Sequence, residues 1–229
     1  EKFSAHNVEV TLVTSYLSNK QDDFSASGTG QLFPDQVWHA LQNNPSNLAI
    51  SSNYVASNLV SGAFRLNDGF QGKYLLTLTG RADASSVLSK ENRWAFFPSA
   101  AAAWRISDEN FMRGQKIFDD LKLRVSYGVA GNAAVKPYAT QSGLILVPYH
   151  WNEQSALAYG LDPTTGNPDL KWELTNTLNG GLDMAFLNNR IIASIDYYDS
   201  RTNDLLLPHQ LPPTSGVRGQ GRGRLRCAP

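Results

Sequence analysis

A period of two in residues 171–186 constrains the fold of this chain more than any other feature of its sequence. The even positions from Trp172 to Phe186 are apolar with a single Asn, whereas the odd positions from Lys171 to Ala185 form the polar set. Residues two apart lie on the same face in a β-strand, and not in a helix. The alternation therefore predicts a long strand with one apolar and one polar face.

A second alternating segment follows after a tight turn. The turn is Leu187-Asn188-Asn189-Arg190, and Asn tolerates the positive φ that short hairpins require. One face of the next strand carries Ile191, Ala193, Ile195 and Tyr197. Strands of soluble sheets average about five or six residues, whereas a membrane-spanning strand needs about 9–11. This hairpin therefore favours a transmembrane β-barrel.

The rest of the chain repeats this pattern. Further strands are predicted at residues 5–17, 54–66, 73–81, 93–106 and 121–129. Long connections are predicted at 18–52 and 130–168, the second with an internal strand at 144–149, and a fairly long one at 85–92. Short turns alternate with them. The prediction is an all-β chain: part of an antiparallel transmembrane β-barrel wall of about seven long strands, with long outer loops and short periplasmic turns.

Composition agrees with this class of protein. The chain has 229 residues with 20 basic and 20 acidic side chains, so net charge favours no nucleic-acid partner. Charged residues are 17%, below the roughly 25% of soluble domains. No apolar run is long enough for a transmembrane helix, and Glu1-Lys2-Phe3-Ser4 does not resemble a signal peptide. The single cysteine, Cys227, excludes an internal disulfide framework.

Aromatic residues lie near the ends of the predicted apolar faces, where a membrane girdle would place them. They are Tyr16, Tyr74, Trp94, Trp104, Tyr127, Trp172, Phe186 and Tyr197. A soluble β-sandwich, in which such residues fill the core, is the alternative. Strand length and loop asymmetry both disfavour it.

Several blocks of sequence in a fixed order are similar to one known family. They are residues 72–76 (GKYLL), 81–86 (RADASS), 92–99 (NRWAFFPS), 104–107 (WRIS), 121–128 (LKLRVSYG) with 131–132 (GN), 167–173 (NPDLKWE), 186–190 (FLNNR), 196–199 (DYYD) and 204–207 (DLLL) with 211–212 (LP). Together they closely resemble the SusC/RagA-type TonB-dependent outer-membrane transporters, over about residues 5–216.

The resemblance implies a bacterial outer-membrane barrel of roughly 22 strands with an N-terminal plug. It also implies import of glycans or peptides, captured with a SusD-like surface lipoprotein and powered by TonB. The seven predicted strands fall far below that number, and no plug or TonB-contacting segment is expected here. We therefore predict that residues 1–216 form part of a TonB-dependent transporter barrel, in contact with outer-membrane lipid.

The family pattern stops after Gly216. Residues 217–229 form a basic tail that we predict to be frameshifted or disordered. Its arginines are Arg218, Arg222, Arg224 and Arg226, and they mimic a nucleic-acid-binding segment. The break in the family pattern at the same place argues against nucleic acid as a partner.

The sequence predicts no catalytic or metal site. The histidines His6, His39, His150 and His209 lack ligand-like spacing, so no metal or cofactor is expected. Acidic residues outside the alternating strands sit at turns and loops, where solvation and capping explain them; they are Asp22, Asp23, Asp68, Asp108, Glu109, Asp119 and Asp120. No nucleophile, phosphate or dinucleotide motif is present. The chain is therefore not expected to be an enzyme.

Two sets of residues are candidates for contact with a substrate or the lumen. Aromatic residues in the long connections are the ligand-binding candidates, because such rings offer large contact area at low entropic cost; they are Trp38, Tyr149, Trp151 and Tyr159. Their alternative role is to pack the loops or contact the lipoprotein. The inward-facing polar residues are expected to line the lumen or touch the plug: Lys73, Arg81, Arg124, Glu173 and Asp183.

The predicted function is TonB-energised uptake of glycan or peptide nutrients across the outer membrane, as part of a larger transporter barrel. Two alternatives stay open on sequence alone. One is a soluble secreted carbohydrate-binding β-sandwich, and the other is a passive porin, which the sequence upstream of this chain would distinguish.

We expect the isolated 229-residue chain to aggregate in buffer without detergent. An open sheet exposes unpaired strand edges and an apolar face that has no partner in water. Size-exclusion chromatography and thermal unfolding of the refolded chain measure this. A monodisperse monomer that melts cooperatively without detergent would contradict the prediction.

Overall fold

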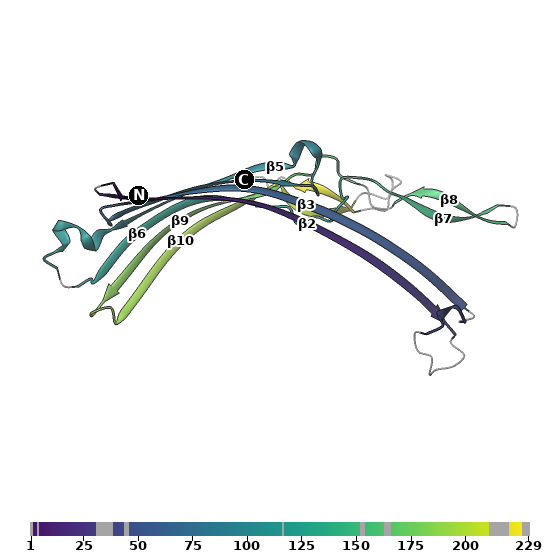
Figure 1. Cartoon of the computed structure of the whole chain (residues 1–229), viewed down its shortest axis with the longest axis horizontal. Coiled ribbons are helices and arrows are strands. Elements are labelled where there is room, and N and C mark those ends of the chain that lie inside the picture. The colour runs from purple at the N-terminus through teal and green to yellow at the C-terminus, as the bar shows by residue number, and fades with distance from the viewer. Residues whose placement is uncertain are drawn as a thin grey trace.

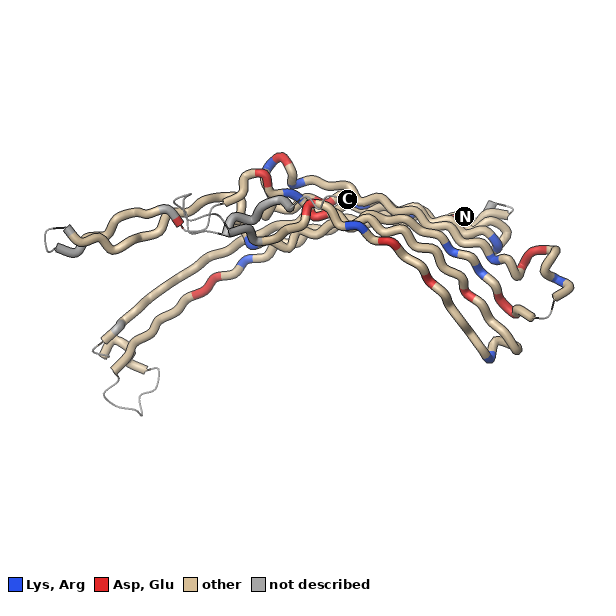
Figure 2. The backbone as a smooth tube through the Cα atoms, turned by 180° about the vertical axis from the view of Figure 1, so that it is seen from behind, with Lys and Arg blue, Asp and Glu red and all other residues tan. Residues whose placement is uncertain are grey.

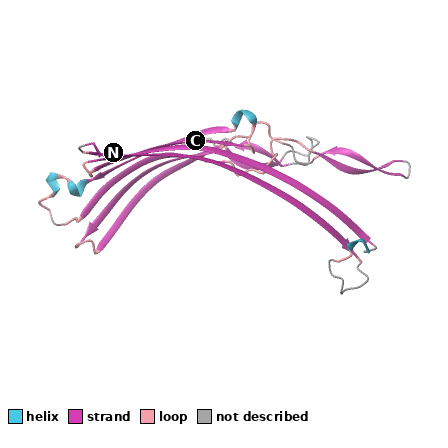
Figure 3. Cartoon of the chain, in the orientation of Figure 1, coloured by secondary structure: helices cyan, strands magenta, loops and turns pink. Residues whose placement is uncertain are grey.

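The computed structural model describes residues 2–3, 5–30, 39–43, 46–115, 117–151, 154–162, 166–210 and 220–225. Nearly all of this part of the chain is β-strand or the connections between strands (Figure 3). The helical elements are short 3-10 turns: η2 (Leu41–Asn43), η3 (Lys90–Asn92), η4 (Ile106–Asp108) and η5 (Asn110–Met112). No helix within the described ranges is long and apolar enough to cross a membrane.

One antiparallel sheet contains most of the strands, in the order β1-β2-β3-β4-β5-β6-β9-β10. Their bounds are β1 (Lys2–Phe3), β2 (His6–Thr29), β3 (Ser46–Phe70), β4 (Tyr74–Ser85), β5 (Trp94–Arg105), β6 (Asp120–Asn132), β9 (Glu173–Phe186) and β10 (Ile191–Asn203). The sheet is a curved, open wall (Figure 1). Apart from the two-residue β1, it has seven long strands, which confirms the predicted fold class.

Two smaller hairpins complete the described structure. The predicted strand at 144–149 is confirmed as β7 (Leu144–Trp151), which pairs with β8 (Gln154–Leu161) and projects away from the sheet (Figure 1). In the second, β11 (Leu205–Gln210) pairs with β12 (Gln220–Leu225). Six residues of the basic tail are thus in a strand. The predicted domain boundary after residue 216, and the origin of the tail, stay predictions, and residues 211–219 and 226–229 lie outside the described ranges.

The two ends of the sheet differ. At one end, which we call the long-loop end, lie the connections β2–β3, β4–β5 and β6–β9. At the other, the short-turn end, lie the connections β3–β4, β5–β6 and β9–β10. The alternation of connections follows the sequence prediction except at β5–β6. That connection, residues 106–119, was expected to be short, but it is longer than the β4–β5 connection, residues 86–93, and carries two 3-10 turns.

β2 and β3 are far longer than predicted. Residues 18–52 were expected to be a long connection, but β2 continues to Thr29 and β3 begins at Ser46. The register runs from His6 opposite Phe70 to Thr29 opposite Ser46. Beyond Ser18 the two strands form a mostly polar ribbon held together by their mutual backbone pairing. Such a ribbon buries no apolar face, so the sequence there lacks the hydrophobic alternation on which the prediction relied.

The turn between β9 and β10 is confirmed. Leu187, Asn188 and Asn189 have φ of 57°, 59° and 59°, in the left-handed region that Asn tolerates. The Arg190 N–H donates to the Phe186 carbonyl at 3.1 Å, and the Asn189 N–H donates to the Asp119 carboxylate at 3.0 Å. The turn is therefore held by one hydrogen bond within the hairpin and by another to the neighbouring β5–β6 connection.

The register separates apolar from polar side chains on the two sides of the sheet. Trp104 pairs with Leu123, Leu123 with Leu182, and Leu182 with Ile195. This side, the apolar face, leaves much of its hydrophobic surface exposed, and Ile195 is 63% exposed. The opposite side, the polar face, carries Arg81, Asp83, Arg124, Asp183 and Asp196 by the same register. An exposed apolar face across the whole sheet is typical of a wall in contact with lipid.

Among the described residues, a cluster of buried side chains lies near the long-loop end. It contains Val87, Leu88, Phe97, Val135, Leu170 and Trp172. The Phe97 and Trp172 rings meet edge to face at 5.3 Å, and the Trp172 indole N–H donates to the Arg93 carbonyl at 2.8 Å. The prediction of a girdle position for Trp172 was therefore wrong. This residue precedes β9 and is only 7% exposed, because loop segments fold over it.

Gly131 is required by this packing. A Cβ at Gly131 would overlap the Phe97 ring, whereas a Cβ at Gly180 would meet nothing within 4 Å. We expect Gly131→Ala to destabilise the assembled barrel by about 1–3 kcal/mol through overpacking. Gly180→Ala, the matched control, should be close to neutral. The temperature at which the folded band disappears from an SDS gel measures both variants, and equal temperatures would contradict the prediction.

Candidate ligand-binding cavity and polar face

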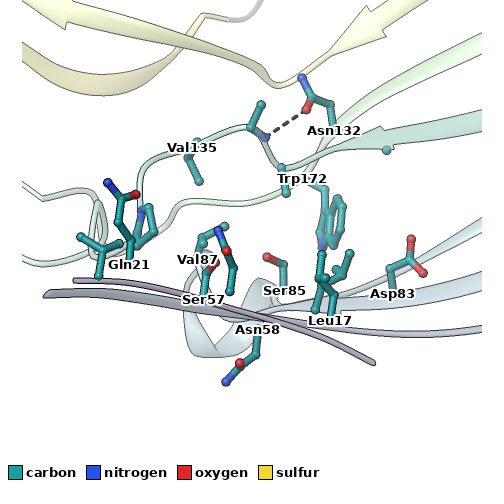
Figure 4. Close-up of a pocket in the computed structure, with 17 residues that line it drawn as sticks. Leu17, Gln21, Ser57, Asn58, Asp83, Ser85, Val87, Asn132, Val135 and Trp172 are labelled. Carbon is teal, nitrogen blue, oxygen red and sulfur yellow. Dashed lines mark hydrogen bonds between the residues drawn. The ribbon is translucent and has the colours of Figure 1, made fainter. Parts of the chain in front are cut away.

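A cavity of about 610 Å³ lies near the long-loop end. Residues of β2, β3 and β4 line it on one side, and the segment after β6 together with Trp172 lines it on the other (Figure 4). Its lining residues are Leu17, Asn19, Gln21, Val55, Ser57, Asn58, Leu59, Asp83, Ser85, Val87, Gly131, Asn132, Ala133, Ala134, Val135, Pro137 and Trp172. Ligand sites typically measure roughly 300–1,000 Å³, so this cavity is of a size to bind a small molecule.

Among the described residues that line the cavity, Asp83 is the only charged one. It is 7% exposed, and its Oδ2 accepts a hydrogen bond from Arg81 Nε at 2.8 Å. Arg81 Nη2 also donates to Ser61 Oγ on β3 at 2.9 Å. The other carboxylate oxygen, Asp83 Oδ1, is buried and accepts no hydrogen bond from the described residues. A buried oxygen without a donor is costly, so the carboxylate depends on its pairing with Arg81.

A network of charges crosses the polar face from β6 to β10. Arg124 binds Asp183 through two hydrogen bonds of 2.8 Å and reaches Asp196 at 3.0 Å. Lys122 contacts Asp183 at 3.1 Å, and Ser194 donates to it at 2.8 Å. Because its members come from β6, β9 and β10, the network ties three strands together on the side opposite the apolar face.

Gly181 makes room for the centre of this network. In the register, Gly181 stands opposite both Arg124 and Asp196. A Cβ at this position would lie 2.8 Å from Arg124 Nη2 and 2.5 Å from Asp196 Oδ1. The glycine therefore lets the guanidinium pass over β9 and reach the carboxylate on β10.

The structure places all five of the predicted lumen residues in hydrogen bonds or ion pairs. Arg81, Arg124 and Asp183 take part in the contacts given above. Glu173 accepts hydrogen bonds from Asn132 Nδ2 at 3.3 Å and from the Leu206 N–H at 2.9 Å. Lys73 differs from the others, because it pairs with Glu109 at the short-turn end, at 3.3 Å.

Two of the four predicted ligand-binding aromatics, Tyr149 and Tyr159, do not line the cavity. Tyr149 and Trp151 belong to β7 and Tyr159 belongs to β8, while Trp38 lies outside the described residues. The register places Tyr149 and Tyr159 on opposite faces of their hairpin, and Tyr159 is 77% exposed. A role in substrate contact stays a prediction for these aromatics.

Glu109 is a site that sequence reasoning missed. It was assigned to a solvated turn, but its Oε1 accepts hydrogen bonds from Tyr74 Oη at 2.7 Å and Trp104 Nε1 at 3.2 Å. Tyr74 and Trp104 are register partners whose rings stack at 6.5 Å on the apolar face. Glu109 therefore orients the polar tips of two aromatic rings at the short-turn end. The predicted alternation already placed both rings on one face, but their shared acceptor lies in a turn without periodicity.

The pKa of Glu109 is held below its usual value, first by the Tyr74 hydroxyl and then by the Trp104 N–H, with Lys73 adding to the effect. A carboxyl group with a lowered pKa stabilises the folded state above its ordinary pKa, and this contribution is lost as pH falls through the folded value. We expect the difference in melting temperature between the wild type and Glu109→Gln to shrink below about pH 4.5. Asp108→Asn is the neighbouring control, and a difference independent of pH would contradict this role.

Charged residues of both signs are interspersed along the strands (Figure 2). Within the described ranges, no group of three or more His, Cys, Asp and Glu side chains is placed to hold a metal ion.

An open sheet with one exposed apolar face, one polar face and unequal ends defines the class of this protein, which is a transmembrane β-barrel wall. The family model "TonB dependent receptor-like, beta-barrel" matches residues 6–226. The chain therefore belongs to the TonB-dependent receptor β-barrel family and, like its SusC and RagA homologues, is a bacterial outer-membrane protein.

Curated relatives support this assignment. The chain is 42% identical to TonB-dependent receptor P26 of Formosa agariphila over 179 residues, covering 77% of this chain and 18% of the relative. It is 35% identical to TonB-dependent receptor SusC of Bacteroides thetaiotaomicron over 231 aligned positions, covering 94% of this chain and 23% of SusC. The chain thus spans about a fifth of the length of these relatives.

Solved structures share the fold. A chain in "Structure of the RagAB peptide transporter" superposes with a TM-score of 0.84 at 28% identity, covering 95% of this chain and 24% of that chain. The RagAB peptide importer in the "open-open" state gives a TM-score of 0.79 at 27% identity, with coverage of 95% and 24%. The wall described above is thus similar to about a quarter of a solved transporter chain.

Proposed function

We propose that this chain forms part of the wall of a TonB-energised importer that carries glycan or peptide nutrients across the outer membrane. The observation that carries the proposal is the division of one continuous sheet into two faces. An exposed apolar face suits lipid, and a polar face with paired charges suits the interior of a barrel. The family is one of transporters, and no catalytic role is proposed.

In this proposal the polar residues form the interior surface of the barrel. Arg81, Arg124, Glu173 and Asp183 would line the lumen or contact a plug, while Lys73 would lie near the periplasmic rim. The internal ion pairs keep these charges compensated, so the interior would present hydrogen-bonding groups rather than a field of one sign. Such a surface suits the passage of hydrated, neutral or mixed-charge nutrients.

A SusD-like surface lipoprotein and TonB are the proposed partners. Relatives named SusC and RagAB support the first, and the family name supports the second. The projecting β7–β8 hairpin, with Leu146 56% and Leu157 69% exposed, offers apolar surface at the long-loop end, where a lipoprotein would dock. The long-loop end would then face outward and the short-turn end the periplasm.

The two alternative functions, a soluble β-sandwich and a passive porin, require different structures. A soluble β-sandwich covers the apolar face of one sheet with a second sheet, and among the described residues the apolar face of the main sheet has no such cover. A passive porin shares the two-faced wall, so energy coupling distinguishes it from a TonB-dependent importer.

Deletion of the gene in its native host tests the proposal. We expect uptake of at least one class of oligosaccharide or peptide to be lost, and deletion of tonB to cause the same loss. Complementation with the intact gene should restore uptake, with the protein in the detergent-soluble outer-membrane fraction. Uptake that survives deletion of tonB but not of this gene would favour the porin. Uptake that survives both deletions would refute import.

A further inference from the structure

We propose that the cavity beside Asp83 is a subsite for one sugar residue of a neutral oligosaccharide. The inference rests on the proposed import function and names the class of substrate that the cavity would accept. It depends on the chemistry of the lining, which combines neutral hydrogen-bonding groups, apolar side chains and one carboxylate whose charge is already compensated.

Neutral polar groups form the floor of the cavity. Asn19 on β2 and Ser57 on β3 are cross-strand partners in the register, so their side chains lie on the same face. No side-chain hydrogen bond joins either of them to another described residue. One amide and one hydroxyl are therefore available at neighbouring positions, and both can donate and accept, as a sugar hydroxyl requires.

Apolar side chains complete the lining. Val87, Val135 and Pro137 come from the segments that fold over the strands. They offer surface to the C–H groups of a ring while the floor binds its hydroxyls. A pocket with mostly apolar walls and a few placed polar groups is the usual form of a small-molecule site.

The charge at the cavity argues for a neutral ligand. Asp83 is paired with Arg81 at 2.8 Å, so the pair offers little net attraction to an ionic group. The Asp83 Oδ1 atom is shielded from solvent, so the carboxylate presents little charge to the cavity.

A peptide fits this site less well. Extended peptides are commonly bound by backbone hydrogen bonds to a free strand edge. Around the cavity, β3 is paired with β2, and its pairing with β4 begins only at Leu59. The Ala56 N–H donates to Tyr138 Oη at 3.3 Å and the Asn58 N–H donates to Ser86 Oγ at 2.8 Å, so these edge donors already have partners. The remaining contacts are made by side chains, and that arrangement suits a ring with hydroxyls around its rim.

Substitutions that fill the cavity test the inference. The transporter purified in detergent from its native outer membrane is incubated with fluorescently labelled neutral oligosaccharides from hydrolysed plant and algal polysaccharides. A tryptic digest of casein serves as the peptide probe. We expect Ser57→Leu to reduce the retained oligosaccharide at least about tenfold, because the larger side chain occupies the site. Ser51→Leu, on the same strand and face but outside the cavity, should leave retention unchanged.

A second variant and its control are used if Ser57→Leu fails to assemble, as judged by heat-modifiable gel mobility. Asn19→Ala removes one hydrogen-bonding group and should weaken retention about three- to tenfold. Asn7→Ala, on the same strand and face near the short-turn end, is its control. The subsite is refuted if a folded variant and its control retain the same amount of labelled oligosaccharide. It is also refuted if the transporter retains only casein peptides, or neither probe.

The outcomes separate this inference from the proposed function. If deletion of the gene abolishes nutrient uptake while the cavity variants bind oligosaccharide normally, only the subsite is refuted. If deletion leaves the uptake of every nutrient unchanged, the import function itself is refuted.

Discussion

Backbone pairing across the main sheet is the constraint on which the rest of the structure depends. Within a bilayer every N–H and C=O must find a partner, and β3, β4, β5, β6 and β9 each find one on both sides. β10 has a neighbour on one side only within the described structure, and β1 covers β2 only at its first residues. The ladder thus requires further strands at its edges as well as lipid on its apolar face. Burial of a core cannot replace either, because the buried cluster is small and lies at one end.

The two faces of the sheet share one register but are stabilised in different ways. On the apolar face, small residues of β5 such as Ala100 and Ala102 lie between larger neighbours, and Tyr74 and Trp104 are fixed through Glu109. On the polar face, the Arg124–Asp183 pair links strands whose apolar sides cannot hold together through the hydrophobic effect when lipid surrounds them. Charge pairing inside and hydrogen-bonded aromatic tips at the rim are therefore complementary ways of stabilising a wall that has little core.

Sequence periodicity predicted the parts of the wall in which one face is apolar and the other polar. It located β4, β5, β6, β9 and β10 and the Asn188-Asn189 turn, because each of these strands must present different chemistry to its two sides. It failed along residues 18–29 and 46–52, a mostly polar ribbon held by backbone pairing, in which the exposed Phe24, Leu48 and Ile50 are too few to give a sustained alternation. Trp172 and Glu109 were misassigned for a related reason. Their positions are set by contacts between segments distant in sequence, and no local period records such contacts.

The asymmetry between the two ends of the sheet explains where binding chemistry can develop. At the short-turn end, connections such as 187–190 are held by left-handed Asn residues and by Asp119, which leaves little room for variation. At the long-loop end, the segment after β6 and the Leu170–Trp172 region can fold back over the strands without disturbing the ladder, since their own backbones are not part of it. The Gly131 position allows this closure by admitting the Phe97 ring. The cavity is thus a consequence of loops packing on a finished wall, so its lining can change in composition while the register beneath it stays the same.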